Sequence, residues 1–488
     1  MPPVQTPLPA ALNSMNSSAG PHAALALLAT LALSGASLAA QTGQDPGPWP
    51  GRFGAPGDEL PPGERGSPNI EVVSHLPLGG YLHVADVEIE QDLDRPFAYV
   101  SKRFTPTGID IISLEDEANA RVIHRWRMEN ADLHVGSGAL DGRYFKHDGR
   151  YYLVQSFQFG QGGPNSDLGA IVFDVTSLPD TSGFREVGRI QSPEIEGGFH
   201  NIYMYKHSDG RPLLFTTTGS PNANVYDMAA FVGGADSHGE ALVAQVPVPE
   251  NRFWAVRGGQ GSWHDFYVGY DAGTGEDRFW GGGTGGYFVW DVSDLENMEL
   301  RASIVGVSGV NWGHTFTPSP DGRFAVGETE YQYAPLRIFD LGPIWAGEQT
   351  TLQRPISAWT ANWRNLSHNH EMRWPYVFVS GYEDGFQVFN MMDPYRPVTW
   401  AYYDTYGGPH ESRGQNNVNT GAWGVDIRNA DGLIVVSDMV TGFWAFRMKG
   451  FDGWNGMDWG MPNISSVQDW DRGPVVQAGT RADGSTMR

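Results

Sequence analysis

The strongest constraint on the fold of this chain is a short apolar strand that recurs seven times with a similar ending. Most copies close on Asp or another polar residue that is followed by an apolar one. The shortest interval between these endings is the 49 residues from Asp291 to Asp340. The longest is 64 residues, from Asp110 to Asp174 and again from Asp227 to Asp291. The seven segments are 108–114, 170–175, 223–228, 287–292, 336–341, 386–391 and 443–448. A repeat of roughly 40 to 55 residues with several strands per unit is typical of β-propellers.

Composition agrees with an all-β fold. The 488 residues include 63 Gly and 33 Pro, and 12% are aromatic, so turn formers and strand formers are abundant. Asp-Gly pairs follow four of the expected inner strands, at 148–149, 209–210, 321–322 and 431–432, and suit tight reversals. We therefore predict one large all-β domain, a seven-bladed β-propeller.

The last repeat predicts how the ring closes. No strand-like segment follows Met448, because the next residues are rich in Gly and Trp. An additional strand-like segment, 70–78, instead precedes the first repeat. We predict that this N-terminal strand completes the last blade and removes the open edges of the sheet.

The segments outside the repeats predict export. The apolar run 23–33 is followed by small residues, so 1–39 is predicted to be a signal peptide, with either Met1 or Met15 as the start. The run is too short to span a bilayer, so no membrane span is expected. The predicted order is then a Pro/Gly linker (40–69), the propeller (70–449) and a Gly/Trp-rich C-terminal extension (450–488). The protein is expected in the periplasm or outside the cell.

Charge and cysteine content exclude several functions. The net charge of −24 argues against nucleic acid as a partner, since its phosphates would be repelled. The chain has no Cys, which excludes disulfides, thiolate catalysis and iron–sulfur clusters.

Parts of the chain resemble a known family. The segments 84–89, 98–101 and 107–114, and the last unit from 424 to 446, are similar to the LVIVD-repeat propellers of exported bacterial proteins. The resemblance covers roughly 70–449 and is sharpest in the first and last units. It implies a seven-bladed exported propeller and, by itself, no activity.

Four histidines replace the usual residues at one position of the repeat. The first and last units place Ala85 and Val425 near the start of their inner strands. Four consecutive middle units place a histidine at the same position, namely His200, His264, His314 and His370. Inner strands surround the channel of a propeller, so these imidazoles are predicted to converge at its upper mouth. Imidazole nitrogens suit iron, copper and zinc.

This predicted arrangement is similar to two other groups of propellers. Carotenoid-cleaving oxygenases hold iron with four histidines on a seven-bladed propeller, and selenium-binding-type propellers carry histidine-lined channels with a metal. The segment 263–266 (Trp-His-Asp-Phe) resembles a short piece of the oxygenase pattern. The likeness is one of arrangement, and it implies a histidine-ringed transition metal, iron or copper with zinc as a further possibility.

Other polar residues could support such a centre. Asp265, Glu371 and Glu328 are candidates for orienting the histidines, and His368 and His410 for acid–base work. The alternative for each histidine is a structural hydrogen bond, as in WD-type propellers, and for each carboxylate a solvated loop position. Trp263, Trp312 and Trp423 could form an aromatic collar for a substrate or pack between blades.

Two functions of different class follow. In the first, the protein is an exported metal-dependent oxidoreductase acting on a small apolar or sulfur-containing molecule. In the second, it is a non-catalytic propeller that binds a surface protein or polymer. Imidazole nitrogens close enough to share one ion would favour the first, and imidazoles bonded separately to backbone carbonyls would favour the second.

Overall fold

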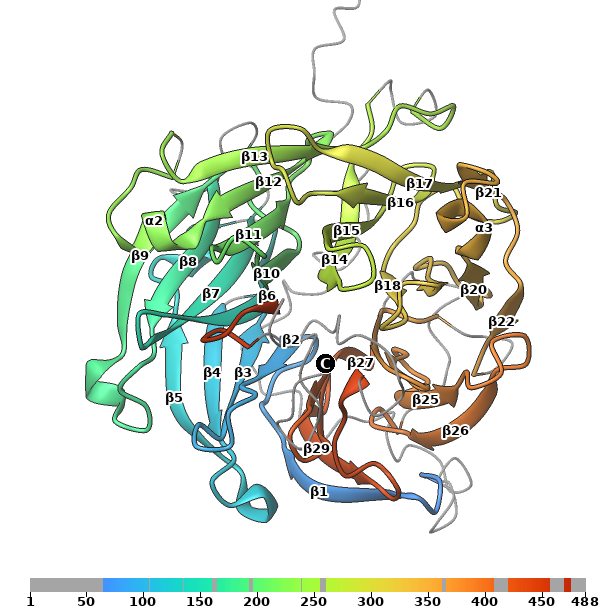
Figure 1. Cartoon of the computed structure of the whole chain (residues 1–488). Coiled ribbons are helices and arrows are strands. Elements are labelled where there is room, and N and C mark those ends of the chain that lie inside the picture. Colours follow the sequence, from blue (N-terminus) through green and yellow to red (C-terminus); the bar gives the residue numbers. More distant parts are fainter. Residues whose placement is uncertain are drawn as a thin grey trace, which may run out of the picture.

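Seven β-sheets surround a central channel in the computed structural model of this chain (Figure 1). The structure describes residues 65–456, except 105, 135, 160–164, 193–195, 238, 255–259, 362–365 and 408–419, and also residues 469–474. The prediction of an all-β, seven-bladed propeller is confirmed. The predicted signal peptide and most of the predicted linker lie outside the described residues.

The first three blades each have four strands, in chain order from the channel outward. Blade 1 contains β2 (Val84–Ile89), β3 (Phe97–Lys102), β4 (Gly108–Ser113) and β5 (Arg121–Arg127). Blade 2 contains β6 (Gly136–His147), β7 (Arg150–Phe159), β8 (Leu168–Asp174) and β9 (Arg185–Gln191). Blade 3 contains β10 (Ile202–Lys206), β11 (Pro212–Thr217), β12 (Asn222–Asp227) and β13 (Leu242–Pro247).

The next three blades follow the same order. Blade 4 contains β14 (Trp263–Asp271), β15 (Glu276–Gly283), β16 (Gly286–Asp291) and β17 (Glu299–Val305), and β21 (Thr351–Leu352) is added in parallel beside β17. Blade 5 contains β18 (Phe316–Pro318), β19 (Phe324–Gly327), β20 (Leu336–Asp340) and β22 (Ser357–Trp359). Blade 6 contains β23 (Asn369–Arg373), β24 (Tyr376–Ser380), β25 (Phe386–Asn390) and β26 (Val398–Tyr403).

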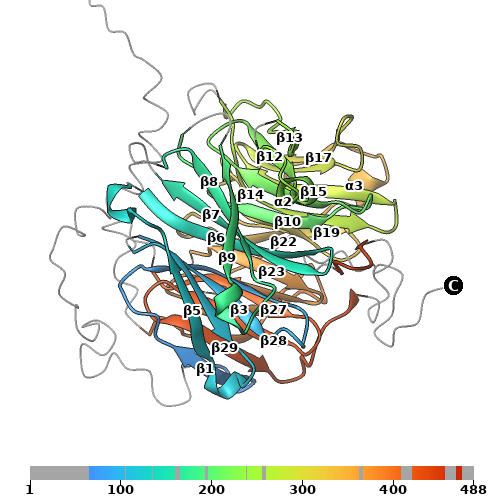
Figure 2. The ribbon, with the colours of Figure 1, turned by 90° about the vertical axis from the view of Figure 1, so that its left-hand side faces the viewer.

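Blade 7 closes the ring as predicted. It contains β27 (Ala422–Arg428), β28 (Leu433–Asp438), β29 (Gly442–Met448) and, as its outer strand, β1 (Ile70–Leu76). β1 runs antiparallel to β29, with Ile70 opposite Met448 and Leu76 opposite Phe443. Seen from the side, β1 and β29 lie next to strands of blade 1 (Figure 2). The two ends of the propeller are thus tied together by a sheet, and blade 7 keeps no unpaired side on β29.

Helices are few and short in the described part of the chain. They are α2 (Met228–Val232), α3 (Gly342–Trp345) and the 3₁₀ turns η2 (Glu117–Asn119), η3 (Ala131–Leu133) and η4 (Thr181–Gly183). Among the described residues, no helix is both long and apolar enough to cross a bilayer.

Burial follows the position of each strand in its blade. Every residue of β4 and β8, the third strands of their blades, is buried, because each blade face packs on a neighbouring blade. The outer strand β5 is exposed or half-buried throughout. The predicted Asp-Gly reversals are also present: Asp148 and Gly149 have φ values of 48° and 72°, the left-handed region that a type I′ hairpin requires.

Candidate metal centre

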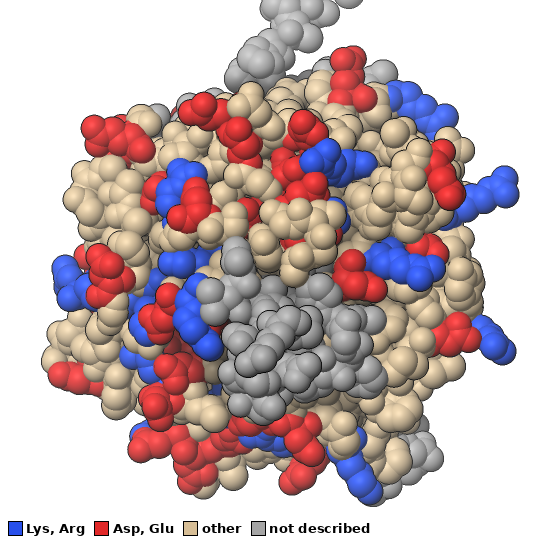
Figure 3. All heavy atoms as spheres, in the orientation of Figure 1, with Lys and Arg blue, Asp and Glu red and all other residues tan. Residues whose placement is uncertain are grey.

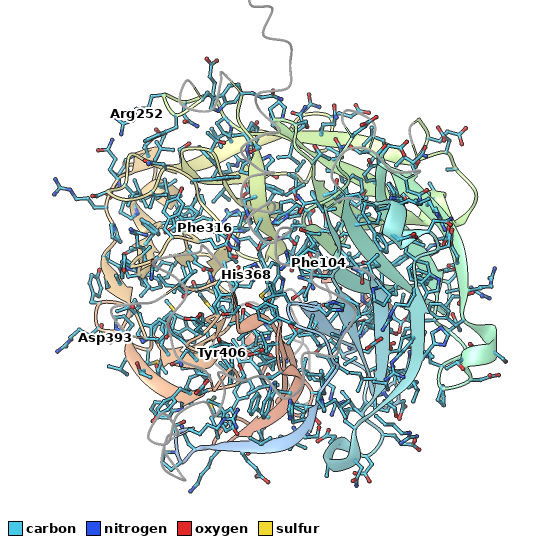
Figure 4. All side chains as sticks on the ribbon, turned by 180° about the vertical axis from the view of Figure 1, so that it is seen from behind. Phe104, Arg252, Phe316, His368, Asp393 and Tyr406 are labelled. Atoms are coloured by element: carbon cyan, nitrogen blue, oxygen red, sulfur yellow. The ribbon has the colours of Figure 1, made fainter. Side chains whose placement is uncertain are left out.

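The four predicted histidines lie where the inner strands of blades 3 to 6 begin, which we call the upper end of the channel. His264 and His370 are the second residues of β14 and β23, and His200 and His314 precede β10 and β18 by two residues. A fifth histidine, His368, lies just before β23 and close to the centre of the molecule in Figure 4.

Four imidazole rings form a continuous row across this end. The ring centroids of His200 and His264 are 4.6 Å apart, and those of His264 and His314 are 4.1 Å apart. The row continues from His314 to His368 at 5.2 Å. Adjacent inner strands therefore bring side chains from blades 3 to 6 into mutual contact.

Two of these histidines and one glutamate could hold a single metal ion. One ligand atom from each of His264, His314 and Glu330 lies within 4.8 Å of the other two. His314 Nε2 and Glu330 Oε2 are 3.8 Å apart. Because metal–ligand bonds to imidazole and carboxylate are about 2.0–2.2 Å long, one ion can bridge this gap.

The glutamate is held in the orientation that a ligand needs. Glu330 lies on the connection between β19 and β20, and Tyr382 Oη donates a hydrogen bond to its Oε1 at 2.5 Å. Its other oxygen, Oε2, faces His314. An outer hydrogen bond of this kind fixes the rotation of a ligating carboxylate.

Hydrogen bonding also sets the tautomer of His314. Thr315 Oγ1 donates to Asp265 Oδ2 at 3.0 Å, so its lone pair accepts from His314 Nδ1 at 2.9 Å. Burial raises the pKa of Asp265 only to about 6, so at neutral pH this carboxylate accepts. With the proton on Nδ1, the Nε2 lone pair is free. That atom is buried and has no hydrogen-bond partner in the described part of the chain.

Burial keeps three imidazoles of the row neutral, those of His200, His314 and His368. It lowers the pKa of His200 to about 4, with help from the charge of Arg103, and the pKa of His368 to about 3. It also holds the pKa of His314 well below its ordinary value. Neutral imidazoles carry the lone pair that binds a metal.

His370 is engaged elsewhere than the other three predicted ligands. Its Nδ1 lies 3.4 Å from Glu328 Oε2, and the same oxygen is 4.0 Å from His314 Nδ1. Burial raises the pKa of Glu328 well above its ordinary value and lowers that of His370 to about 3. Glu328 thus lies between His314 and His370. It faces Nδ1 of His314, whereas Glu330 faces Nε2, so the two carboxylates lie on different sides of that ring.

The remaining predicted site residues have other partners or lie elsewhere. His368 Nδ1 donates to the Trp423 carbonyl at 2.7 Å. Glu371 pairs with Arg373 at 2.9 Å and lines a separate cavity of about 40 Å³ lower in the channel, together with Asp426. His410 lies outside the described residues.

The three tryptophans divide between the two roles considered for them. Trp263 is buried in the core and donates from Nε1 to the Val246 carbonyl. Trp312 contacts His264 edge-on at 5.4 Å, and Trp423 packs on His368 at 4.0 Å. Trp263 therefore packs between strands, whereas the other two adjoin the imidazole row.

Sequence reasoning missed Glu330, Tyr382 and Thr315. The segment 328–330 (Glu-Thr-Glu) directly follows β19, and two carboxylates after one strand are a signal that could have pointed to Glu330. No sequence signal points to Tyr382. Its hydrogen bond to Glu330 forms only because the loop after β24 approaches the loop between β19 and β20.

Comparison of the chain with models of known protein families found no match, and comparison with curated proteins found none either. The fold and the geometry of the site are therefore the basis for assigning a function.

Proposed function

We propose that this protein binds a transition metal at the upper end of its channel, through His264, His314 and Glu330. The observation that carries the proposal is the mutual approach of these three ligand atoms, with the outer partners Thr315 and Tyr382 orienting two of them. Outer hydrogen bonds of this kind accompany most metal ligands in proteins. His200, whose ring contacts His264, is the next imidazole along the row.

The ligand set narrows the choice of metal. Two imidazoles and one carboxylate with open positions suit non-haem iron, and the same set also binds catalytic zinc. Copper is consistent with a third imidazole from His200. An oxidoreductase activity would require iron or copper, because zinc has no redox chemistry. In that case, a small molecule is oxidised beside Trp312 and Trp423, and an external acceptor such as dioxygen takes the electrons.

The LVIVD-type resemblance and export belong to the same proposal. We place the protein in the periplasm or outside the cell on the basis of the apolar run 23–33. Detection of a mature form that begins after residue 39 in the exported fraction would test this.

One observation favours the non-catalytic alternative. His368 is bonded to a backbone carbonyl, which is the arrangement expected of a structural histidine. On the face shown in Figure 3, however, acidic and basic side chains are interspersed among the described residues, and no broad patch of one sign marks a docking surface. The grouping of three ligand atoms makes the metal centre the better supported reading.

Metal content of the purified, untagged protein tests the proposal. After growth with iron, copper and zinc, elemental analysis is expected to find about one equivalent per chain. Glu330→Gln is the most informative variant, because its amide oxygen can still accept from Tyr382 while the charge is lost. We expect it to lose more metal affinity than the roughly 10–100-fold typical of an outer-shell change.

The matched control is Glu240→Gln, which removes an exposed carboxylate between α2 and β13. It should leave metal content unchanged. The double variant His264→Ala with His314→Ala should bind no metal at this site. If that double variant keeps the metal and only melts at a lower temperature, the proposed metal centre is wrong. The alternative function, a non-catalytic propeller that binds a surface protein or polymer, is then the better explanation.

A further inference from the structure

Arg103 is a half-buried cation beside the row of imidazoles. It directly follows β3, and its guanidinium carbon lies 4.5 Å from the ring centroid of Trp423 and 4.8 Å from that of Phe104. Trp423 also packs on His368. Phe104 and His368 both lie toward the centre of the molecule in the view of Figure 4. The rings of Trp423 and His368 thus connect Arg103 to the proposed ligand His314.

This cation is poorly compensated. In the part of the chain that the structure describes, no carboxylate oxygen lies within the 4.0 Å of an ion pair from its guanidinium nitrogens. Its Nη2 reaches Ser137 Oγ at 3.4 Å, and its Nε is buried without a hydrogen-bond partner. Burial lowers the pKa of Arg103 only to about 10, so it stays charged at neutral pH. A buried N–H group without a partner is unfavourable, so the Nε–H of Arg103 has capacity for an anion.

The proposed metal ligand Glu330 has partners other than Arg103. Glu330 itself is bonded to Tyr382 and faces His314, rather than pairing with Arg103.

We propose that Arg103 binds the carboxylate of a small organic acid, whose apolar body lies against the aromatic rings of Phe104 and Trp423 near the metal. A guanidinium offers a planar pair of donors that matches one carboxylate. The surrounding rings suit an apolar or planar body more than a sugar or a peptide. The inference rests on the proposed metal centre for its chemistry, because it names the substrate class of that site, but anion binding can be measured without the metal.

Benzoate is the probe, since it is a planar aromatic carboxylate, and benzamide is its neutral counterpart of the same shape. Binding of both would be measured by calorimetry or ligand-observed NMR, on full-length protein with zinc bound and after treatment with EDTA. Benzoate is expected to bind about tenfold or more tightly than benzamide, in line with the strength of charge-assisted hydrogen bonds.

Arg103→Met should remove this preference while leaving zinc content and benzamide affinity unchanged. Arg103→Lys should keep part of the preference for benzoate, because the positive charge remains. The rest should be lost, because lysine lacks the planar pair of donors that matches a carboxylate. The matched control is Arg125→Met, which removes an exposed arginine from β5 and changes the net charge equally. It should leave benzoate binding intact.

Several results would overturn the assignment: failure of benzoate to bind the folded protein, equal affinity for benzamide, or unchanged benzoate binding in folded Arg103→Met. If Arg103→Met does not fold, a reduced benzoate preference in Arg103→Lys supports the proposal and full retention of the preference contradicts it. The two proposals can fail separately. Arg103-dependent benzoate binding by a protein that takes up no metal refutes only the metal centre. Metal uptake without that dependence refutes only the anion site.

Discussion

The lower channel offers a sharp test of how charge is balanced inside this propeller. One nitrogen of Arg143, Nη1, lies 2.8 Å from Asp86 Oδ2, 3.2 Å from Glu88 Oε2 and 3.0 Å from Asp141 Oδ1. The arginine side chain is only 20% exposed, and the three carboxylates are less exposed still. A single cation therefore compensates three buried acids from the inner strands of blades 1 and 2.

Replacing Arg143 with Met keeps the apolar stem and removes the charge. Breaking a buried ion pair by removing one partner typically costs about 3–5 kcal/mol, because the other partner is left uncompensated. For a domain of about 380 residues (70–449), unfolding entropy of about 2.1 cal/mol/K per residue amounts to about 0.8 kcal/mol/K. The variant is therefore expected to melt about 4–6 °C below the wild type at pH 7.

The cost should depend on pH in a defined direction. Burial raises the pKa values of Glu88 and Asp141 well above their ordinary values, and Arg143 opposes this rise. A carboxyl group whose pKa is higher in the folded than in the unfolded state binds more protons when the chain is folded. It therefore lowers the free energy of unfolding at high pH, and this loss of stability decreases as the pH falls. Without Arg143 the pKa values rise further. The stability deficit of the variant should thus be largest near pH 7 and shrink toward about pH 4, where carboxyls of the unfolded chain protonate.

Denaturant unfolding followed by tryptophan fluorescence at pH 7, 5.5 and 4.5 measures the effect. Arg143→Met combined with Glu88→Gln should recover part of the stability, since one buried charge is then gone. Arg125→Met is the matched control, because that arginine is 62% exposed and should cost at most about 1 kcal/mol. A deficit that is independent of pH, or no larger than that of the control, would refute the reasoning.

Two further predictions concern closure of the ring and orientation of the metal ligand. A truncated chain that begins at Leu78 lacks β1 and exposes the edge of β29, so it is expected to aggregate in light scattering, whereas one that begins at Arg65 should remain monodisperse. Thr315→Val removes the hydroxyl that fixes His314, and metal titration should show a loss of about 10–100-fold in affinity, while Thr315→Ser should bind as the wild type does. Normal behaviour of the shorter chain, or equal affinities of the two Thr315 variants, would contradict the respective prediction.

The ring and its closure could be read from the chain because both depend on local, repeated signals. Strand patterns of similar length recur, Asp-Gly pairs mark the reversals, and the strand missing after Met448 reappears at 70–78. Each blade buries its faces against its neighbours, so each repeat must carry a similar pattern of apolar residues. Such a repeated pattern can be recognised from the sequence alone. The position of the histidines in the repeat was visible for the same reason.

The composition of the candidate site was decided only by tertiary structure. His264, His314 and Glu330 come from blades 4 and 5 and Tyr382 from blade 6, so their approach depends on the packing of three consecutive blades. Arg103 comes from blade 1 and meets Trp423 of blade 7, so its position also depends on closure of the ring. His370 shares the position of His264 in the repeat, yet it faces Glu328, because neighbouring loops set which groups each side chain meets. Sequence spacing places a residue on a strand, but the loops that lie over the channel vary in length and sequence from blade to blade. Contacts between such loops follow no period, and only the folded chain determines them.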